Sequence, residues 1–116
     1  MKPLTVLVVD DEQVICDACR LVLSENGHQV SHCITGHQGL LEIEHNVYDL
    51  ILLDMKLPDI HGTRILEFVR KRSLPSTVIV MTGYSTLSNA VEAMKLGAAD
   101  YLSKPFSEDE LLATID

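Results

Sequence analysis

The sequence has no apolar run long enough to cross a membrane. Its longest apolar runs hold only about four or five residues, whereas a membrane-spanning helix needs about 20. We also expect no signal peptide, because residues 1–3 lead directly into a strand-like segment. We therefore expect a cytoplasmic protein that makes no contact with a membrane.

Basic residues are scarce in this chain. Nine Lys and Arg residues stand against 17 Asp and Glu residues, which gives a formal net charge of −8 at pH 7. A protein that binds nucleic acid by itself needs a basic surface that displaces counterions from the phosphates. We therefore expect no direct nucleic-acid binding by this chain. Any role on DNA would pass through another domain or a partner.

Cysteine is too rare for a disulfide framework, since the chain has three, which is an odd number. Cys16 and Cys19 have the C-x-x-C spacing of redox proteins, but they lie inside a predicted helix and not at its start. We interpret them as packing residues. The five histidines lack zinc-ligand spacing on a common helix, and we expect them at surface or boundary positions.

The chain does have enough apolar residues for a core, because 47% of its 116 residues are hydrophobic. Short apolar segments alternate with segments of helical periodicity. The predicted strands are residues 4–9, 29–33, 50–53, 77–81 and 100–103, and the predicted helices are residues 13–26, 35–44, 63–71, 86–96 and 107–116. The last predicted helix continues to residue 116 without a Gly or Pro that would end it. We therefore expect residues 1–116 to be one domain at the N-terminus of a longer protein.

Alternation of strands and helices with short connections is typical of an α/β fold with helices on both faces of a parallel sheet. Right-handed crossovers leave few arrangements of the strands. We predict the flavodoxin-like, doubly wound arrangement, with five strands in the order 2-1-3-4-5 and five helices. In this order ligands bind beyond the carboxyl ends of the strands, where strands 1 and 3 are neighbours.

Polar side chains follow four of the predicted strands at these carboxyl ends. They are Asp10 and Asp11, Asp54, Thr82, and Lys104. One lysine cannot neutralise three carboxylates, whereas Mg²⁺ can, because it binds a few carboxylates and keeps several waters. A metal ion beside a carboxylate, a hydroxyl and an ammonium group is what the transfer of a phosphoryl group onto that carboxylate requires.

Four motifs in register connect this site with a known family. They are VVDDE at residues 8–12, LDMKLPD at residues 53–59 followed by Gly62, MTG at residues 81–83, and GAADYLSKPF at residues 97–106. Together they resemble the receiver domain of bacterial two-component response regulators, over essentially the whole chain. Residues 81–106 are most similar to receivers attached to ATPase-type transcription activators.

The resemblance implies a role for each acidic residue of the site. Asp54 would be the phosphoacceptor. Asp10, Asp11 and Asp54 would position Mg²⁺, with the backbone carbonyl of Lys56 as a further ligand. Lys56 and Tyr84 lie two residues after Asp54 and Thr82, at positions where family members vary, and we expect them to tune the lifetime of the phosphoryl group.

The resemblance also implies how the signal leaves the site. Thr82 would be the switch hydroxyl, Tyr101 the switch aromatic residue, and Lys104 the cation that binds the phosphoryl group. The Lys104–Pro105 bond would be cis, which only a following proline makes tolerable. Phosphorylation would change the face built from the fourth helix, the fifth strand and the fifth helix.

The predicted function is therefore a phosphorylation-dependent switch and not a turnover enzyme. Its expected partners are a sensor histidine kinase, its own C-terminal output domain, which we expect to control transcription, and a second copy in a phosphorylation-dependent homodimer.

Two alternatives remain open at this stage. An aspartate-nucleophile phosphatase would use the same groups, but it needs Asp-x-Asp where this chain has Asp10-Asp11, and room for a substrate-capping domain. A flavodoxin needs a glycine- and hydroxyl-rich phosphate loop after the first strand, where acids here would repel phosphate.

Overall fold

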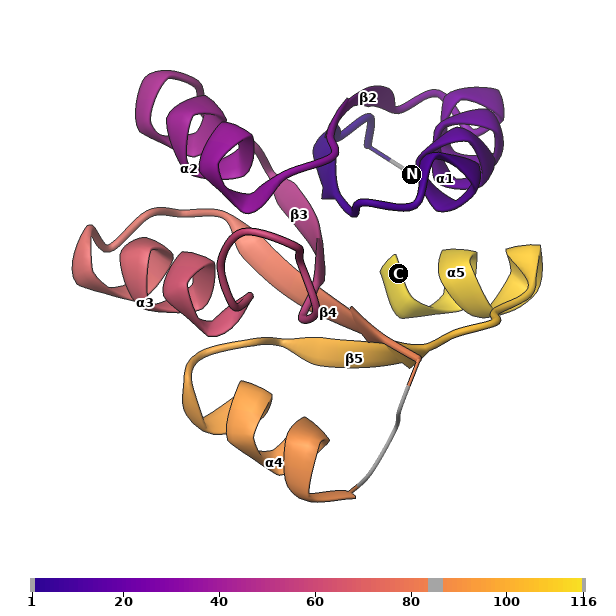
Figure 1. Cartoon of the computed structure of the whole chain (residues 1–116). Coiled ribbons are helices and arrows are strands. Elements are labelled where there is room, and N and C mark those ends of the chain that lie inside the picture. The colour runs from indigo at the N-terminus through magenta and orange to yellow at the C-terminus, as the bar shows by residue number, and fades with distance from the viewer. Residues whose placement is uncertain (1, 84–86, 116) are drawn as a thin grey trace.

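The computed structural model describes residues 2–83 and 87–115 (Figure 1). Within them, strands and helices alternate along the chain as predicted. The elements are β1 (Thr5–Val9), α1 (Gln13–Glu25), β2 (Gln29–Cys33), α2 (Gly36–His45), β3 (Leu50–Asp54), α3 (Thr63–Lys71), β4 (Thr77–Thr82), α4 (Leu87–Lys95), β5 (Asp100–Ser103) and α5 (Glu108–Ile115). The predicted first residue of the fourth helix, Thr86, and the last residue, Asp116, lie outside the described residues.

The strands of the described chain form one parallel sheet in the order β2-β1-β3-β4-β5, which confirms the predicted topology. Strand β1 pairs with both β2 and β3, so the strand order reverses on either side of it. All five residues of β3 are buried. A strand that is covered on both faces is apolar throughout, which explains the run Leu50–Leu53.

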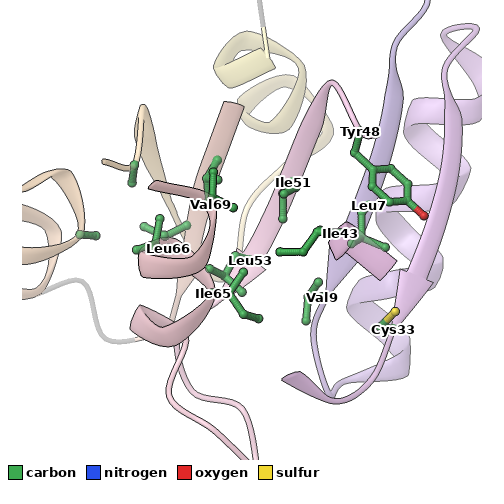
Figure 2. Close-up of a cluster of buried hydrophobic side chains, with 14 residues drawn as sticks. Leu7, Val9, Cys33, Ile43, Tyr48, Ile51, Leu53, Ile65, Leu66 and Val69 are labelled. Atoms are coloured by element: carbon green, nitrogen blue, oxygen red, sulfur yellow. The ribbon is translucent and has the colours of Figure 1, made fainter. Parts of the chain in front are cut away.

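Helices cover both faces of the sheet (Figure 1). Helices α2, α3 and α4 lie on one face, and helices α1 and α5 lie on the other. Alternate residues of each strand point to opposite faces. Leu7 and Leu53 therefore join the core beneath α2 and α3 (Figure 2), while Val8 and Leu52 join the core beneath α1 and α5.

Side-chain caps fix the starts of two helices. At the start of α5, the Ser107 N–H donates to Glu110 Oε1 and the Glu110 N–H donates to Ser107 Oγ, both at 3.1 Å. This confirms the capping box that the Ser-x-x-Glu spacing predicts. At the start of α2, Thr35 Oγ1 accepts a bond of 3.2 Å from the Gln38 N–H, which is the first half of the predicted box.

The structure confirms the packing role of the two cysteines of α1 and corrects the prediction for one histidine. Cys16 and Cys19 are fully buried in α1. Burial raises the pKa of Cys16 to about 11 and that of Cys19 to about 12, so both are unreactive thiols that pack in the core. The predicted surface or boundary position is wrong for His28, which is buried, and its Nδ1 accepts a 3.0 Å bond from the Leu4 N–H.

No helix in the described part of the chain combines the length and the apolar character that a membrane-spanning helix needs.

Candidate functional site

The site lies at the carboxyl ends of neighbouring strands. Asp10 directly follows β1, Asp54 and Thr82 are the last residues of β3 and β4, and Lys104 directly follows β5. The Lys104 N–H donates to the Thr82 carbonyl at 2.8 Å, so the ladder between β4 and β5 continues to the lysine. The strand order places these ends side by side, which brings residues about 90 positions apart in the sequence into one site.

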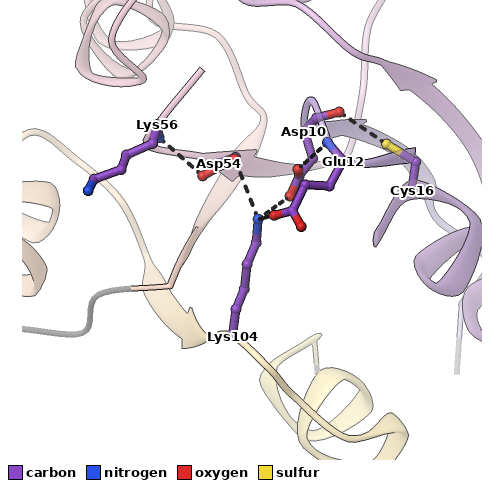
Figure 3. A network of polar contacts seen from close by, with 6 residues as sticks. All are labelled: Asp10, Glu12, Cys16, Asp54, Lys56 and Lys104. Carbon is purple, nitrogen blue, oxygen red and sulfur yellow. Dashed lines mark hydrogen bonds and ion pairs between the residues drawn. The ribbon is translucent and has the colours of Figure 1, made fainter. Parts of the chain in front are cut away.

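The ammonium group of Lys104 lies at the centre of the site (Figure 3). Its Nζ is 2.6 Å from Asp10 Oδ2, 3.1 Å from Glu12 Oε1 and 3.4 Å from Asp54 Oδ2. Its side chain is only 10% exposed and that of Asp10 is fully buried. A cation shielded from water interacts strongly with its neighbours, so this group orients the surrounding carboxylates.

Sequence reasoning missed Glu12. Among the described residues, Asp10, Glu12 and Asp54 form a group whose carboxylate oxygens lie within 4.8 Å of one another. The Glu12 N–H donates to Asp10 Oδ1 at 2.9 Å, which turns the chain back over the end of β1. Asp11 is exposed and does not belong to this group, so its role as a metal ligand stays a prediction. The only signal for Glu12 was its place in an acidic run after a strand.

Asp54 is a buried carboxylate with a partner for each oxygen. It is 5% exposed, and its Oδ1 accepts a 3.1 Å bond from the Lys56 N–H while its Oδ2 faces Lys104. Burial raises the pKa of the Asp54 carboxyl to about 6, and the charge of Asp10 adds to the rise. The Lys56 N–H and Lys104 act in the opposite direction. The carboxylate is therefore mostly ionised at neutral pH, but it binds a proton more readily than an ordinary aspartate.

Lys104 keeps its charge in this environment. Burial by itself lowers the pKa of its ammonium group, but the bond to Asp10 and the charges of Asp54 and Asp10 outweigh burial. The net effect raises the pKa of Lys104 above its ordinary value. A permanent cation thus lies next to Asp54, where it can stabilise negative charge on a group attached to that carboxylate.

The donor set fits a hard divalent cation. Three carboxylates surround one ammonium group, so two negative charges are left without compensation within the group. Its ligand atoms are all oxygens, which suits Mg²⁺ or Ca²⁺ better than a metal ion that prefers sulfur or nitrogen. Asp10, Glu12 and Asp54 are therefore the residues that could hold a metal ion here.

The remaining predicted residues lie around this centre. Thr82 is 8% exposed at the end of β4, whose Met81 pairs with Asp54 across the strands. Tyr101 lies on β5 and is 42% exposed. The side chain of Lys56 extends away from Asp54 (Figure 3). Tyr84 lies outside the described residues.

The peptide bond between Lys104 and Pro105 is cis, as the sequence motif predicts. A family model described as the response regulator receiver domain matches residues 6–116 of the chain. The chain belongs to the receiver domain family. The match begins at the second residue of β1 and includes every later strand and helix of the described chain, so the fold and the family assignment agree.

Two transcriptional regulators illustrate the relatives of this receiver domain. DltR of Streptococcus agalactiae serotype III (strain NEM316) is 41% identical over 109 residues, which are 94% of this chain and 49% of DltR. ZraR of Escherichia coli (strain K12) is 36% identical over 111 residues, which are 96% of this chain and 25% of ZraR. The chain thus spans about half or less of the length of these relatives.

Solved receiver domains have the same fold. The receiver domain of the Francisella response regulator 1452 superposes with a TM-score of 0.90 at 34% sequence identity. The superposition covers 98% of this chain and 93% of the Francisella chain. This receiver domain therefore has the fold of the family without a large insertion or deletion.

Proposed function

We propose that this receiver domain is a phosphorylation-dependent signalling switch that accepts a phosphoryl group from a sensor histidine kinase onto Asp54. The observation that supports this proposal most is the environment of Asp54. It is a buried carboxylate of raised pKa, with Lys104 Nζ at 3.4 Å and two further carboxylates within 4.8 Å. Such a site places a cation, and carboxylates that can bind a metal ion, next to the oxygen to which a phosphoryl group would be attached.

In the proposed reaction an oxygen of the Asp54 carboxylate attacks the phosphorus atom of a phosphohistidine on the kinase. The new phosphorus–oxygen bond forms as the phosphorus–nitrogen bond breaks, and the released imidazole takes up a proton. Lys104 stabilises the charge of the transferred oxygens, since its Nζ already faces Asp54. The Lys56 N–H holds the other carboxylate oxygen and so orients the nucleophile.

The reaction is proposed to depend on Mg²⁺. Asp10, Asp54 and Glu12 are the candidate ligands from the structure, and Asp11 and the Lys56 carbonyl are candidates from the family motif. When bound, the ion would neutralise part of the charge of the phosphoryl group. Lys104 has ion-pair contacts with the same carboxylates. When Mg²⁺ also binds these carboxylates, the Lys104 ammonium group would be able to turn toward the phosphoryl oxygens.

The output of the switch is proposed to be the face built from α4, β5 and α5. Thr82 moves toward the phosphoryl group, and the Tyr101 ring turns into the space that it leaves. Val91 and Met94 of α4 and Tyr101 of β5 are all more than 40% exposed. In the proposed complex another protein would cover these exposed apolar side chains. We assign this role to a second copy or to a C-terminal output domain.

The longer relatives support the rest of the proposal. DltR and ZraR are named transcriptional regulatory proteins and extend well beyond the matched region. We therefore propose a cytoplasmic regulator in which residues 1–116 form the N-terminal receiver, and in which an output domain like that of ATPase-type activators controls transcription. The receiver itself would act as a switch and not as a turnover enzyme.

Intact-mass measurement after incubation with a small phosphodonor and Mg²⁺ tests the proposal. The wild-type chain should gain the mass of one phosphoryl group and retain it, and Asp54→Ala should gain none. Asp49→Ala is a control, because Asp49 lies at the opposite end of β3. Robust phosphorylation of Asp54→Ala would refute the site. Steady release of phosphate without an adduct would favour the alternative, an aspartate-nucleophile phosphatase.

A further inference from the structure

The loop between β3 and α3, residues 55–62, carries Lys56 next to the phosphoacceptor. The loop folds back on itself through an antiparallel bridge between Lys56 and His61. The Gly62 N–H also donates to the Met55 carbonyl at 3.0 Å. Because the two halves of the loop are bonded to each other, anything that holds the second half also fixes the backbone of Lys56.

Asp59, in the second half of this loop, binds the first turn of α2. Its Oδ1 accepts a 2.9 Å bond from the Gly36 N–H, and its Oδ2 accepts a 2.9 Å bond from the His37 N–H. The His37 ring adds a contact of 2.7 Å between its Nδ1 and Asp59 Oδ2. One side chain thus ties the loop to a helix that starts 23 residues earlier in the sequence.

Helix α2 is built to receive a carboxylate from outside. The first N–H groups of a helix have no partner within it, and the helix dipole favours negative charge there. Helix α2 has no acidic residue in its own first turn. Thr35 Oγ1 accepts only the Gln38 N–H among these groups, so Asp59 supplies both the missing acceptors and the missing charge.

An apolar contact holds the same two segments together. A Cβ atom at Gly36 would collide with the side chain of Ile60, so the helix start and the loop approach as closely as a glycine allows. Ile60 and Leu57 pack against the core cluster beneath α2 and α3. The loop is therefore seated by packing, and the contacts of Asp59 determine its position at the start of α2.

We propose that Asp59 and His37 are positioning residues for the phosphoacceptor site. By holding the loop against α2, they keep the Lys56 N–H on Asp54 and keep the Lys56 carbonyl where the site needs a metal ligand. Neither side chain touches the reacting atoms. The part of this inference that concerns the metal depends on the proposed function, whereas the part that concerns the Lys56 amide depends only on the loop.

The contacts predict a graded series of variants. Asp59→Ala removes all three contacts, and Asp59→Asn retains one carbonyl oxygen as an acceptor. His37→Ala removes the ring contact but leaves both backbone N–H bonds to Asp59. The effect should therefore decrease from Asp59→Ala through Asp59→Asn to His37→Ala.

Titration of the chain with Mg²⁺ alone gives the first measurement. Residues that orient metal ligands typically change affinity by about 10- to 100-fold when removed. We expect Asp59→Ala to weaken Mg²⁺ binding by about tenfold, at the lower end of this range, because packing of the loop persists. Asp49→Ala is the control for the loss of a purely structural contact. Asp49 also accepts a hydrogen bond from a backbone N–H, that of Thr5, but it lies at the far end of the sheet. His45→Ala, on the same helix, controls for His37→Ala.

The amide signal of Lys56 in metal-free protein gives the second measurement. Its chemical shift and its protection from hydrogen exchange should change in Asp59→Ala and should keep their wild-type values in Asp49→Ala. A smaller change in the same direction is expected for Asp59→Asn, which also carries the test if Asp59→Ala does not fold. If the Lys56 amide signal in Asp59→Asn lies between those of Asp59→Ala and the wild type, this supports a role of Asp59 in positioning the loop and not a general loss of stability.

Two results would overturn the inference. One is an unchanged Lys56 amide in Asp59→Ala. The other is an equal loss of Mg²⁺ affinity in Asp59→Ala and Asp49→Ala. If the wild-type chain binds no Mg²⁺, the proposed function fails, but the Lys56 amide still decides whether Asp59 positions the loop.

Discussion

Replacement of Asp54 by asparagine should stabilise the metal-free protein at neutral pH, although it removes the proposed phosphoacceptor. Asp54 is 5% exposed, and burial raises its pKa to about 6. A raised pKa means that the ionised carboxylate is less favourable in the folded state than in the unfolded chain. Asparagine has nearly the same shape and carries no charge, so it avoids this cost.

The size of the effect follows from the pKa of Asp54. Its rise from the ordinary value of 3.8 to about 6 is worth about 3 kcal/mol, because one pKa unit corresponds to about 1.4 kcal/mol. Lys104 retains its contacts with Asp10 at 2.6 Å and Glu12 at 3.1 Å in the variant. We therefore expect a gain in unfolding free energy of up to about 3 kcal/mol, or about 10 °C in Tm.

The gain should depend on pH in a defined window. Between about pH 4 and pH 6, the folded wild-type chain holds a proton on Asp54 that the unfolded chain has lost. The unfolding free energy of the wild type therefore falls as the pH rises through this window. The asparagine variant lacks this proton. Its advantage should be absent below about pH 4, grow up to about pH 6 and stay constant above it.

Urea unfolding in the presence of a metal chelator, at several pH values, measures this difference. Asp49→Asn is the control of opposite sign, because the Thr5 N–H lowers the pKa of Asp49 and its charge stabilises the folded state above the ordinary pKa. The reasoning is refuted if Asp54→Asn is no more stable than wild type at about pH 8. A gain that is the same at every pH would show that ionisation is not its cause.

Three further predictions concern the site and its output. Asp11→Ala should weaken Mg²⁺ binding by about tenfold or more, as measured by titration. An unchanged affinity would show that Asp11 is not a ligand of the metal. Thr82→Ala and Lys104→Ala should still accept some phosphoryl group but complete the conformational change only in part. A charge-assisted hydrogen bond is worth about 1.5–3 kcal/mol, and a full switch needs about 5.5 kcal/mol. NMR shifts on phosphorylation equal to those of wild type would contradict this. Beryllofluoride should change the sedimentation of the wild-type chain or the hydrogen exchange of residues 87–106, and Lys95→Glu should alter the response. No change in either measurement would exclude the proposed output face.

The sequence predicted the sheet well because its central strands are buried on both faces. Such strands appear as short apolar runs, and their boundaries were off by one residue where a polar side chain ends the run. Strands β3 and β4 include Asp54 and Thr82, since backbone pairing continues to Met81 and Ser103. Side-chain polarity marks where burial ends, whereas hydrogen bonds decide where a strand ends.

Contacts between distant segments could not be predicted in the same way. Glu12 reaches Lys104 across 92 residues, and Asp59 caps a helix that starts 23 residues before it. The ring of the buried His28 accepts a hydrogen bond from the N–H of Leu4, which lies 24 residues earlier in the sequence. None of these contacts follows from local periodicity, because each depends on the strand order and on loop conformation.

The raised pKa of Asp54 connects the core with the chemistry of the site. A carboxylate stabilised by several donors would have a low pKa and would be a weaker nucleophile, whereas burial at the end of β3 keeps Asp54 basic. This costs the folded state up to about 3 kcal/mol, which is a large fraction of the stability of a small domain. The apolar runs of β1 and β3, covered by helices on both faces, offset this cost. A binding partner that neutralises Asp54, whether a proton, a metal ion or a phosphoryl group, should therefore also stabilise the fold.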